Sequence, residues 1–193
     1  MITTQPIAAL FVRHDSIYKV FPGVDCYDVE RDAKKWVGGC PVVAHPPCRA
    51  WSALAHMSTA PQSERDLTPW AVEIVRQWGG VLEHPQRSRI WRELPKPWMN
   101  DRWGTVIECN QWHWGHVASK PTRLYVCGLS SLPEMPLRSG TPKKTVTGIK
   151  GQPGRRCTNI EREATPQDFA AWLVEVARKC RGYQVITESE VNI

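Results

Sequence analysis

Short apolar runs recur along the first two thirds of this chain, and polar or proline-containing segments separate them. Runs of this length, bounded by turn residues, are typical of buried strands, especially those of parallel sheets that are covered on both faces. The pattern predicts strands at Ile7–Val12 (IAALFV), Val24–Glu30 (VDCYDVE), Cys40–Pro47 (CPVVAHPP) and Gly80–Pro85 (GVLEHP), with two further candidates at 103–111 (WGTVIECNQ) and 122–128 (TRLYVCG).

Two segments show a helical pattern with start and stop signals. In residues 66–80 (DLTPWAVEIVRQWGG), Thr68 is a good N-cap, Pro69 takes the first helical position and the Gly79–Gly80 pair ends the helix. Residues 164–180 (ATPQDFAAWLVEVARKC) predict a second helix, with Thr165 as cap and basic residues in the last turn.

Strands that alternate with helices and loops predict an α/β fold, and we expect a three-layer Rossmann-like sandwich with a mostly parallel sheet. A length of 193 residues fits a single domain spanning 1–193, with a basic loop insertion at about 129–160. No apolar run is long enough for a transmembrane helix, and the first residues lack a signal-peptide pattern. We therefore expect a cytoplasmic protein with no membrane partner.

The seven cysteines are an odd number with irregular spacing, and no CxxC pair occurs, so reduced thiols are expected. A zinc site would have to draw on Cys40, His45, Cys48 and His84. Their spacing matches no short zinc pattern, and we predict no metal site. His45 and His84 each lie beside a proline at a strand end, where we expect them to hydrogen-bond as scaffolding.

Several chemically capable side chains lie at the ends of predicted strands. Asp28 and Glu30 close the second strand, Cys48 follows the third, and Glu83 lies near the end of the fourth. Ligands of open α/β sheets bind at the carboxyl ends of the strands, so these four side chains are expected to converge on one edge of the sheet. Cys48 is then a nucleophile, a metal ligand or a buried structural thiol. The proline pair before it favours a projecting loop over a buried thiol.

Positive charge is concentrated between residues 120 and 156, where Glu134 is the only acid. A solvated loop is one interpretation, and a phosphate-contacting loop is the other. The candidate nucleic-acid-binding residues are Lys120, Lys143, Lys144, Arg155 and Arg156.

Three segments carry a family resemblance: AHPPCRAWS at 44–52, GGVLEHP at 79–85 and QWHWGHVASKPTRLYV at 111–126. Taken together they resemble the Pro-Pro-Cys nucleophile loop, the Glu-Asn strand (with His84 in place of asparagine) and the Gln…Gly…Lys-Pro-Thr strand pair of C5-cytosine DNA methyltransferases. The likeness covers roughly Leu10 to Val126 and is closest to the shortened members that phages often carry. Two family features are missing, namely the glycine-rich turn after the first strand and the large target-recognition domain.

The resemblance implies that Cys48 is a nucleophile that adds to C6 of a pyrimidine, with DNA or a nucleotide as substrate. It also implies that Glu83 contacts N3 of the base, and that Arg49 or Arg123 favours the thiolate or holds a phosphate. The implied cofactor is S-adenosylmethionine, with candidate contacts from Arg13, Asp15, Ser16, Asp28, Glu30 and Pro46.

Two alternatives stay open at this point. One keeps the cysteine and glutamate but uses another cofactor or another nucleobase chemistry, as the glycine-free first loop suggests. The other is a non-enzymatic protein that binds DNA or a host component on the same scaffold. The sequence does not address the oligomeric state.

Overall fold

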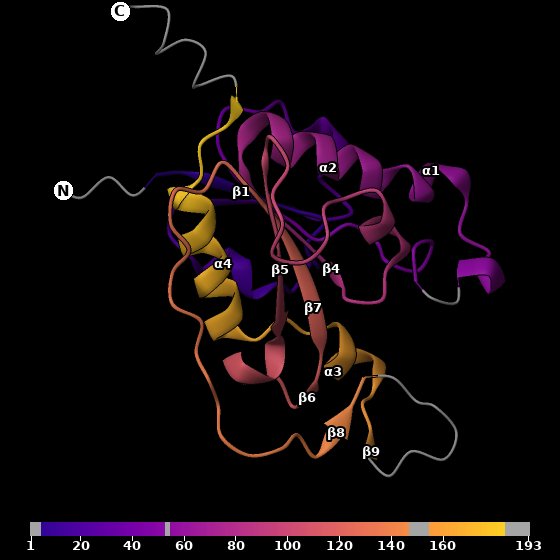
Figure 1. Cartoon of the computed structure of the whole chain (residues 1–193). Helices are drawn as coiled ribbons and strands as arrows, with labels where there is room; N and C mark the ends of the chain where they lie inside the picture. Colours follow the sequence, from indigo (N-terminus) through magenta and orange to yellow (C-terminus); the bar gives the residue numbers. More distant parts are fainter. Residues whose placement is uncertain (1–4, 53–54, 147–154, 184–193) are drawn as a thin grey trace, which may run out of the picture.

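The computed structural model describes residues 5–52, 55–146 and 155–183. A six-stranded sheet runs through the molecule in the order β2-β1-β3-β4-β7-β5 (Figure 1). β1 to β4 are mutually parallel, and β7 is antiparallel to both of its neighbours. The predicted α/β class and the mostly parallel sheet are therefore confirmed. The strands are β1 (Ile7–Leu10), β2 (Val24–Tyr27), β3 (Val42–Ala44), β4 (Gly80–Pro85), β5 (Gly104–Asn110) and β7 (Pro121–Cys127).

Two longer helices cover opposite faces of this sheet. α2 (Leu67–Trp78) packs on the face that carries Ala8, Leu10 and Leu82, and α4 (Gln167–Lys179) packs on the face that carries Ile7 and Val81. Because neighbouring residues of a strand point to opposite faces, an uninterrupted apolar strand suits a sheet with helices on both sides. The shorter helices are α1 (Gln62–Arg65) and α3 (Asn159–Glu163), and the 3₁₀ turns are η1 (Ile17–Val20), η2 (Ala33–Lys35), η3 (Ala55–Met57), η4 (Arg89–Arg92) and η5 (Gln111–Trp114).

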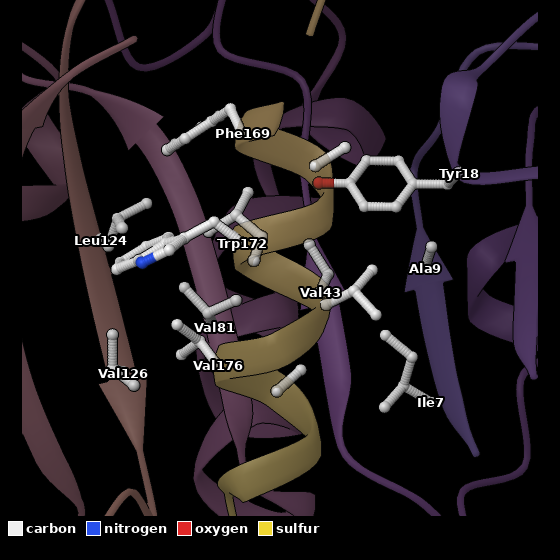
Figure 2. Close-up of a cluster of buried hydrophobic side chains, with 14 of the residues drawn as sticks. Ile7, Ala9, Tyr18, Val43, Val81, Leu124, Val126, Phe169, Trp172 and Val176 are labelled. Atoms are coloured by element: carbon white, nitrogen blue, oxygen red, sulfur yellow. The ribbon is translucent and has the colours of Figure 1, made fainter. Parts of the chain in front are cut away.

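The core beneath α4 is dense and aromatic (Figure 2). The helix buries Phe169, Trp172 and Val176 at helical spacing, and these side chains meet valines and leucines of the central strands. Phe169 and Trp172 stack at 6.3 Å between ring centroids. The Tyr18 ring joins the same cluster beside β1 and β3.

Several boundaries differ from the predicted ones. α2 begins at Leu67 with Asp66 as its cap residue, so Thr68 is a fully buried first-turn residue rather than the N-cap. Pro69 is tolerated there because amide groups of the first turn have no partner within the helix. The first three strands end before their predicted limits, so Asp28 and Glu30 lie in the turn after β2.

The basic segment, which showed no periodicity, contributes to a second, three-stranded sheet beside the main one. This sheet joins β6 (Ala118–Ser119), β8 (Lys144–Thr145) and β9 (Arg155–Arg156) through parallel pairing (Figure 1). α3 follows directly and is fixed by a capping box between Thr158 and Glu161. Residues 147–154 of the predicted loop insertion lie outside the described residues.

Within the described ranges, no helix combines the length and the apolar character that a membrane crossing requires.

Candidate functional site

The chain changes direction across the sheet between β1 and β3. β2 lies on one side of β1, and β3 followed by β4 lies on the other, so the connections diverge where β1 meets β3. Such a switch point opens a crevice at the carboxyl ends of the strands, where ligands of doubly wound sheets bind. The segments that follow β1 and β3 carry Tyr18 and the His45–Cys48 stretch to this edge.

A hydrogen-bonded row of side chains crosses the switch point. Nδ1 of His45 lies 2.9 Å from Oε2 of Glu83, and Nε2 of the same ring lies 2.9 Å from the hydroxyl of Tyr18. The Tyr18 side chain is buried, while His45 and Glu83 are 14% and 13% exposed. The row therefore joins the loop after β1, the end of β3 and β4, and its outer end reaches solvent.

Gln111 holds the second oxygen of Glu83. Its Nε2 lies 3.2 Å from Oε1 of Glu83 and 3.2 Å from the hydroxyl of Thr122, whose own hydroxyl donates to the carbonyl of Lys120 at 3.0 Å. Gln111 is almost fully buried at the start of η5. The antiparallel strand β7 thus supports the carboxylate from the side opposite to His45.

Glu83 is held in its charged form. Burial by itself would raise the pKa of this carboxyl, but the hydrogen bond from His45 and the positive charge of Lys120 outweigh it and lower the pKa to about 2. Glu83 therefore presents a carboxylate at neutral pH.

Cys48 lies on a turn fixed by backbone contacts. Pro46 and Pro47 have no amide hydrogen to donate, so the last bond from β3 to β1 is made by the amide of His45 to the carbonyl of Leu10, at 3.0 Å. Beyond the prolines, the amide of Trp51 donates to the Cys48 carbonyl at 3.0 Å. This arrangement ends the strand and leaves Cys48 exposed.

The Cys48 thiol lies within the electrostatic reach of the carboxylate and of two cations. Desolvation raises its pKa, and the Glu83 charge raises it further, whereas the charges of Lys120 and Arg162 lower it. The ammonium of Lys120 is itself partly desolvated, which lowers its pKa, while Glu83 and Cys48 act in the opposite direction. The free protein therefore holds Cys48 as a thiol, with Lys120 placed to favour the thiolate.

His84 lies beneath the proline pair. Its ring is 1% exposed and packs edge-on against Trp91, with 6.4 Å between the centroids. Burial lowers its pKa to about 4, although the Glu83 charge and the carbonyls of Pro46 and Pro47 act in the opposite direction. A neutral imidazole thus supports the turn that carries Cys48, in keeping with the expected scaffold role.

The two candidate arginines are engaged elsewhere. Arg49 forms a two-pronged ion pair with Glu64. Arg123 pairs with Glu108 at 2.7 Å. Arg123 is in register with His84 while Leu124 is in register with Glu83, so Arg123 points to the opposite face of the sheet from Glu83. The structure therefore brings Lys120, rather than either arginine, to the cysteine and the glutamate.

The candidate cofactor residues mostly contact one another. Asp28 accepts hydrogen bonds from Lys19 and from two backbone amides, and these contacts lower its pKa to about 2. Arg13 bonds to Asp15 and Glu163, and the Ser16 hydroxyl caps η1. Of the remaining two candidates, Glu30 is exposed and Pro46 is buried.

The candidate nucleic-acid contacts separate into two groups. Lys143 and Arg156 are exposed, Lys144 pairs with Glu161, and Arg155 belongs to β9. These residues lie on or beside the second sheet. Lys120 instead donates from its ammonium to the carbonyl of Ala164 at 3.1 Å, at the end of α3, and belongs to the Cys48–Glu83 group.

Tyr18 and Gln111 were not identified from the sequence as site residues. Tyr18 sits in a loop whose approach to β3 depends on strand order, and no spacing signal links it to His45. Gln111 belongs to the QWHWGHVASKPT segment that carried the resemblance, and this was the one signal that pointed to it.

Among the residues that the structure describes, no group of three or more histidine, cysteine or acidic side chains is arranged to hold a metal ion. No protein-family model matches the chain, and no curated protein matches it with significant similarity. The geometry and chemistry of the site are thus the basis for a functional proposal.

Proposed function

We propose that this chain is an enzyme that attacks a pyrimidine base of DNA or of a nucleotide through Cys48, and that it is most simply a cytosine C5 methyltransferase-like protein. One observation carries the proposal: an exposed thiol, a carboxylate and a desolvated lysine meet at the switch-point edge of the sheet. Carboxyl-end crevices of open α/β sheets are where such folds bind their ligands.

Each of the three groups has a part in the chemistry. A thiolate adds to C6 of the pyrimidine, forms a carbon–sulfur bond and later leaves by elimination. The positive charge of Lys120 lowers the pKa of Cys48 and thereby favours the attacking form. Glu83 faces the edge of the base and accepts hydrogen bonds from its N–H groups.

The fold supports this proposal. Parallel central strands, an antiparallel β7 and one helix on each face agree with a three-layer Rossmann-like sandwich, the architecture that nucleoside-binding enzymes commonly use. All seven cysteines are free thiols, which agrees with a reducing, cytoplasmic setting.

S-adenosylmethionine is the cofactor that the family resemblance implies, and the described residues fit it poorly. The segment after β1 has no glycine to admit the cofactor to the backbone, although Phe11 adopts the left-handed conformation (φ 60°) that a glycine would favour. The carboxylate of Asp28, the natural ribose ligand, is already occupied by Lys19. These contacts favour the alternative in which the same cysteine and glutamate serve another cofactor or another nucleobase chemistry.

The basic second sheet supports a nucleic-acid partner. Lys143 and Arg156 are exposed there, and α3 connects this sheet to Lys120 at the site. Neutralising Lys143 and Arg156 together is expected to weaken DNA binding and to flatten its salt dependence by about two phosphate contacts. Unchanged affinity and salt slope would remove the second sheet from the proposal.

Covalent trapping tests the proposal. DNA containing 5-fluorocytosine is incubated with the protein, with and without S-adenosylmethionine, and adducts are measured by intact-mass spectrometry. We expect an adduct that Cys48→Ala abolishes and that Cys40→Ala retains, because Cys40 precedes the other end of β3 and is also a free thiol.

The two cofactor conditions separate the readings. An adduct only in the presence of S-adenosylmethionine assigns methyl transfer, and an adduct without it assigns other pyrimidine chemistry. No adduct in either condition contradicts the nucleophile role. A cellular phenotype that Cys48→Ala leaves intact would then favour the non-enzymatic alternative.

A further inference from the structure

The hydroxyl of Tyr18 determines where the proton of His45 lies. Tyr18 is 1% exposed, and within the described part of the chain the hydrogen-bond partner of its hydroxyl is Nε2 of His45, at 2.9 Å (Figure 2 shows the ring within the core). A buried hydroxyl has a single hydrogen, and leaving that hydrogen unpaired is costly. Tyr18 therefore donates to Nε2, so Nε2 carries no proton.

The same accounting extends to Glu83. A neutral imidazole with Nε2 as acceptor carries its hydrogen on Nδ1, and Nδ1 lies 2.9 Å from Oε2 of Glu83. Gln111 donates to Oε1 from the other side, at 3.2 Å. Every group in the row then has a matching partner only if Glu83 is a carboxylate.

We propose that Tyr18 and His45 are positioning residues, which hold His45 as its Nδ1–H tautomer and hold Glu83 as an ionised acceptor at the substrate edge. Tyr18 acts through His45, and His45 acts through Glu83. The role of this acceptor in binding an N–H of a base rests on the proposed function, whereas the tautomer is a property of the free protein.

The surroundings of Glu83 agree with this assignment. The charged and titratable groups that act on it come from several elements: His45 from the end of β3, Lys120 from the turn before β7, His84 from β4 itself, and the Cys48 thiol from the proline turn. Tyr18 approaches through His45 from η1. The ammonium of Lys120 stabilises the carboxylate, and none of these partners requires Glu83 to donate a hydrogen bond.

Nitrogen-15 NMR of histidine-labelled protein tests the proposal directly, without substrate or cofactor. We expect the His45 ring at neutral pH to show a protonated Nδ1 and an unprotonated Nε2, which is the tautomer that free histidine disfavours in water. His116 serves as an internal reference with the opposite tautomer, because its Nε2 faces the carbonyl of Glu161 at 3.0 Å and its Nδ1 accepts from the amide of Ala118.

Tyr18→Phe completes the test. Removing the hydroxyl is expected to shift the Nε2 resonance of His45 downfield, toward the position of a nitrogen that accepts no hydrogen bond, and to leave His116 unchanged. A protonated Nε2 in the wild-type protein would overturn the proposal even if Tyr18→Phe failed to fold, and so would an Nε2 resonance that the substitution does not move. Because no DNA is involved, a failed trapping experiment leaves this result intact, and the reverse also holds.

Discussion

Gly80 is the position where a single added methyl group would disturb the alignment of the site. It opens β4 with φ +122°, in register with Val42 of β3. A Cβ built on Gly80 would lie 2.0 Å from the carbonyl oxygen of Val42 and 2.6 Å from its amide nitrogen. Both are backbone atoms of the neighbouring strand, so no side-chain rotation relieves the clash.

Gly80→Ala therefore has two costs. A non-glycine residue at positive φ costs about 1–2 kcal/mol, and forcing atoms into a packed region costs about 1–3 kcal/mol more. We expect the free energy of unfolding to fall by about 2–5 kcal/mol. Gly39→Ala is the matched control, because Gly39 also has positive φ (+103°) but a Cβ there would meet no atom within 4 Å. It is expected to lose only the strain component.

Urea unfolding followed by tryptophan fluorescence measures both variants against the wild type. Equal losses in Gly80→Ala and Gly39→Ala would refute the close approach of β3 and β4. The same strand pair carries Cys48 and Glu83 to the sheet edge, so a folded Gly80→Ala protein should also show altered Cys48 alkylation.

Three further predictions follow from individual side chains. Because the pKa of Glu83 is lowered to about 2, its contribution to folding is present above about pH 4.5 and is lost as the pH falls toward 2; it amounts to about 3 kcal/mol, and urea unfolding at a series of pH values should show a shallower loss for Glu83→Gln. The raised pKa of Cys48 predicts iodoacetamide alkylation slower than that of free cysteine at pH 8, and Glu83→Gln should accelerate it because the Glu83 charge raises that pKa; a rate equal to or above that of free cysteine would contradict the assignment. Phe169→Ala removes a fully buried ring and should cost about 3–5 kcal/mol, whereas Ile160→Ala, at a residue 72% exposed, should stay within about 0.5 kcal/mol; comparable losses in thermal unfolding would refute the core assignment.

Much of the fold could be read from local patterns. The apolar runs at Ile7–Val12 and Gly80–Pro85 predicted strands because a parallel strand buried on both faces is apolar at consecutive positions. Boundaries were less predictable where tertiary contacts decide them. Thr68 resembles a cap in sequence, but burial beneath the sheet draws it into the first turn of α2.

The second sheet shows the same limit more strongly. β8 and β9 are each two residues long, and their parallel pairing with β6 joins parts of the chain that carry no shared sequence signal. Pairing between distant strands depends on where the rest of the chain places them, and local propensity does not encode that.

The sequence by itself determined which residues end strands at the candidate site, because proline cannot continue a ladder and acids are rare in buried strands. Those two rules were enough to select Cys48 and Glu83. Only the tertiary structure decided their partners. Strand order placed Tyr18 beside His45, register turned Arg123 to the other face, and the turn before β7 brought Lys120 to the thiol. Side-chain partnerships across a sheet depend on strand order and register, which are set by packing over the whole domain rather than by neighbours in sequence.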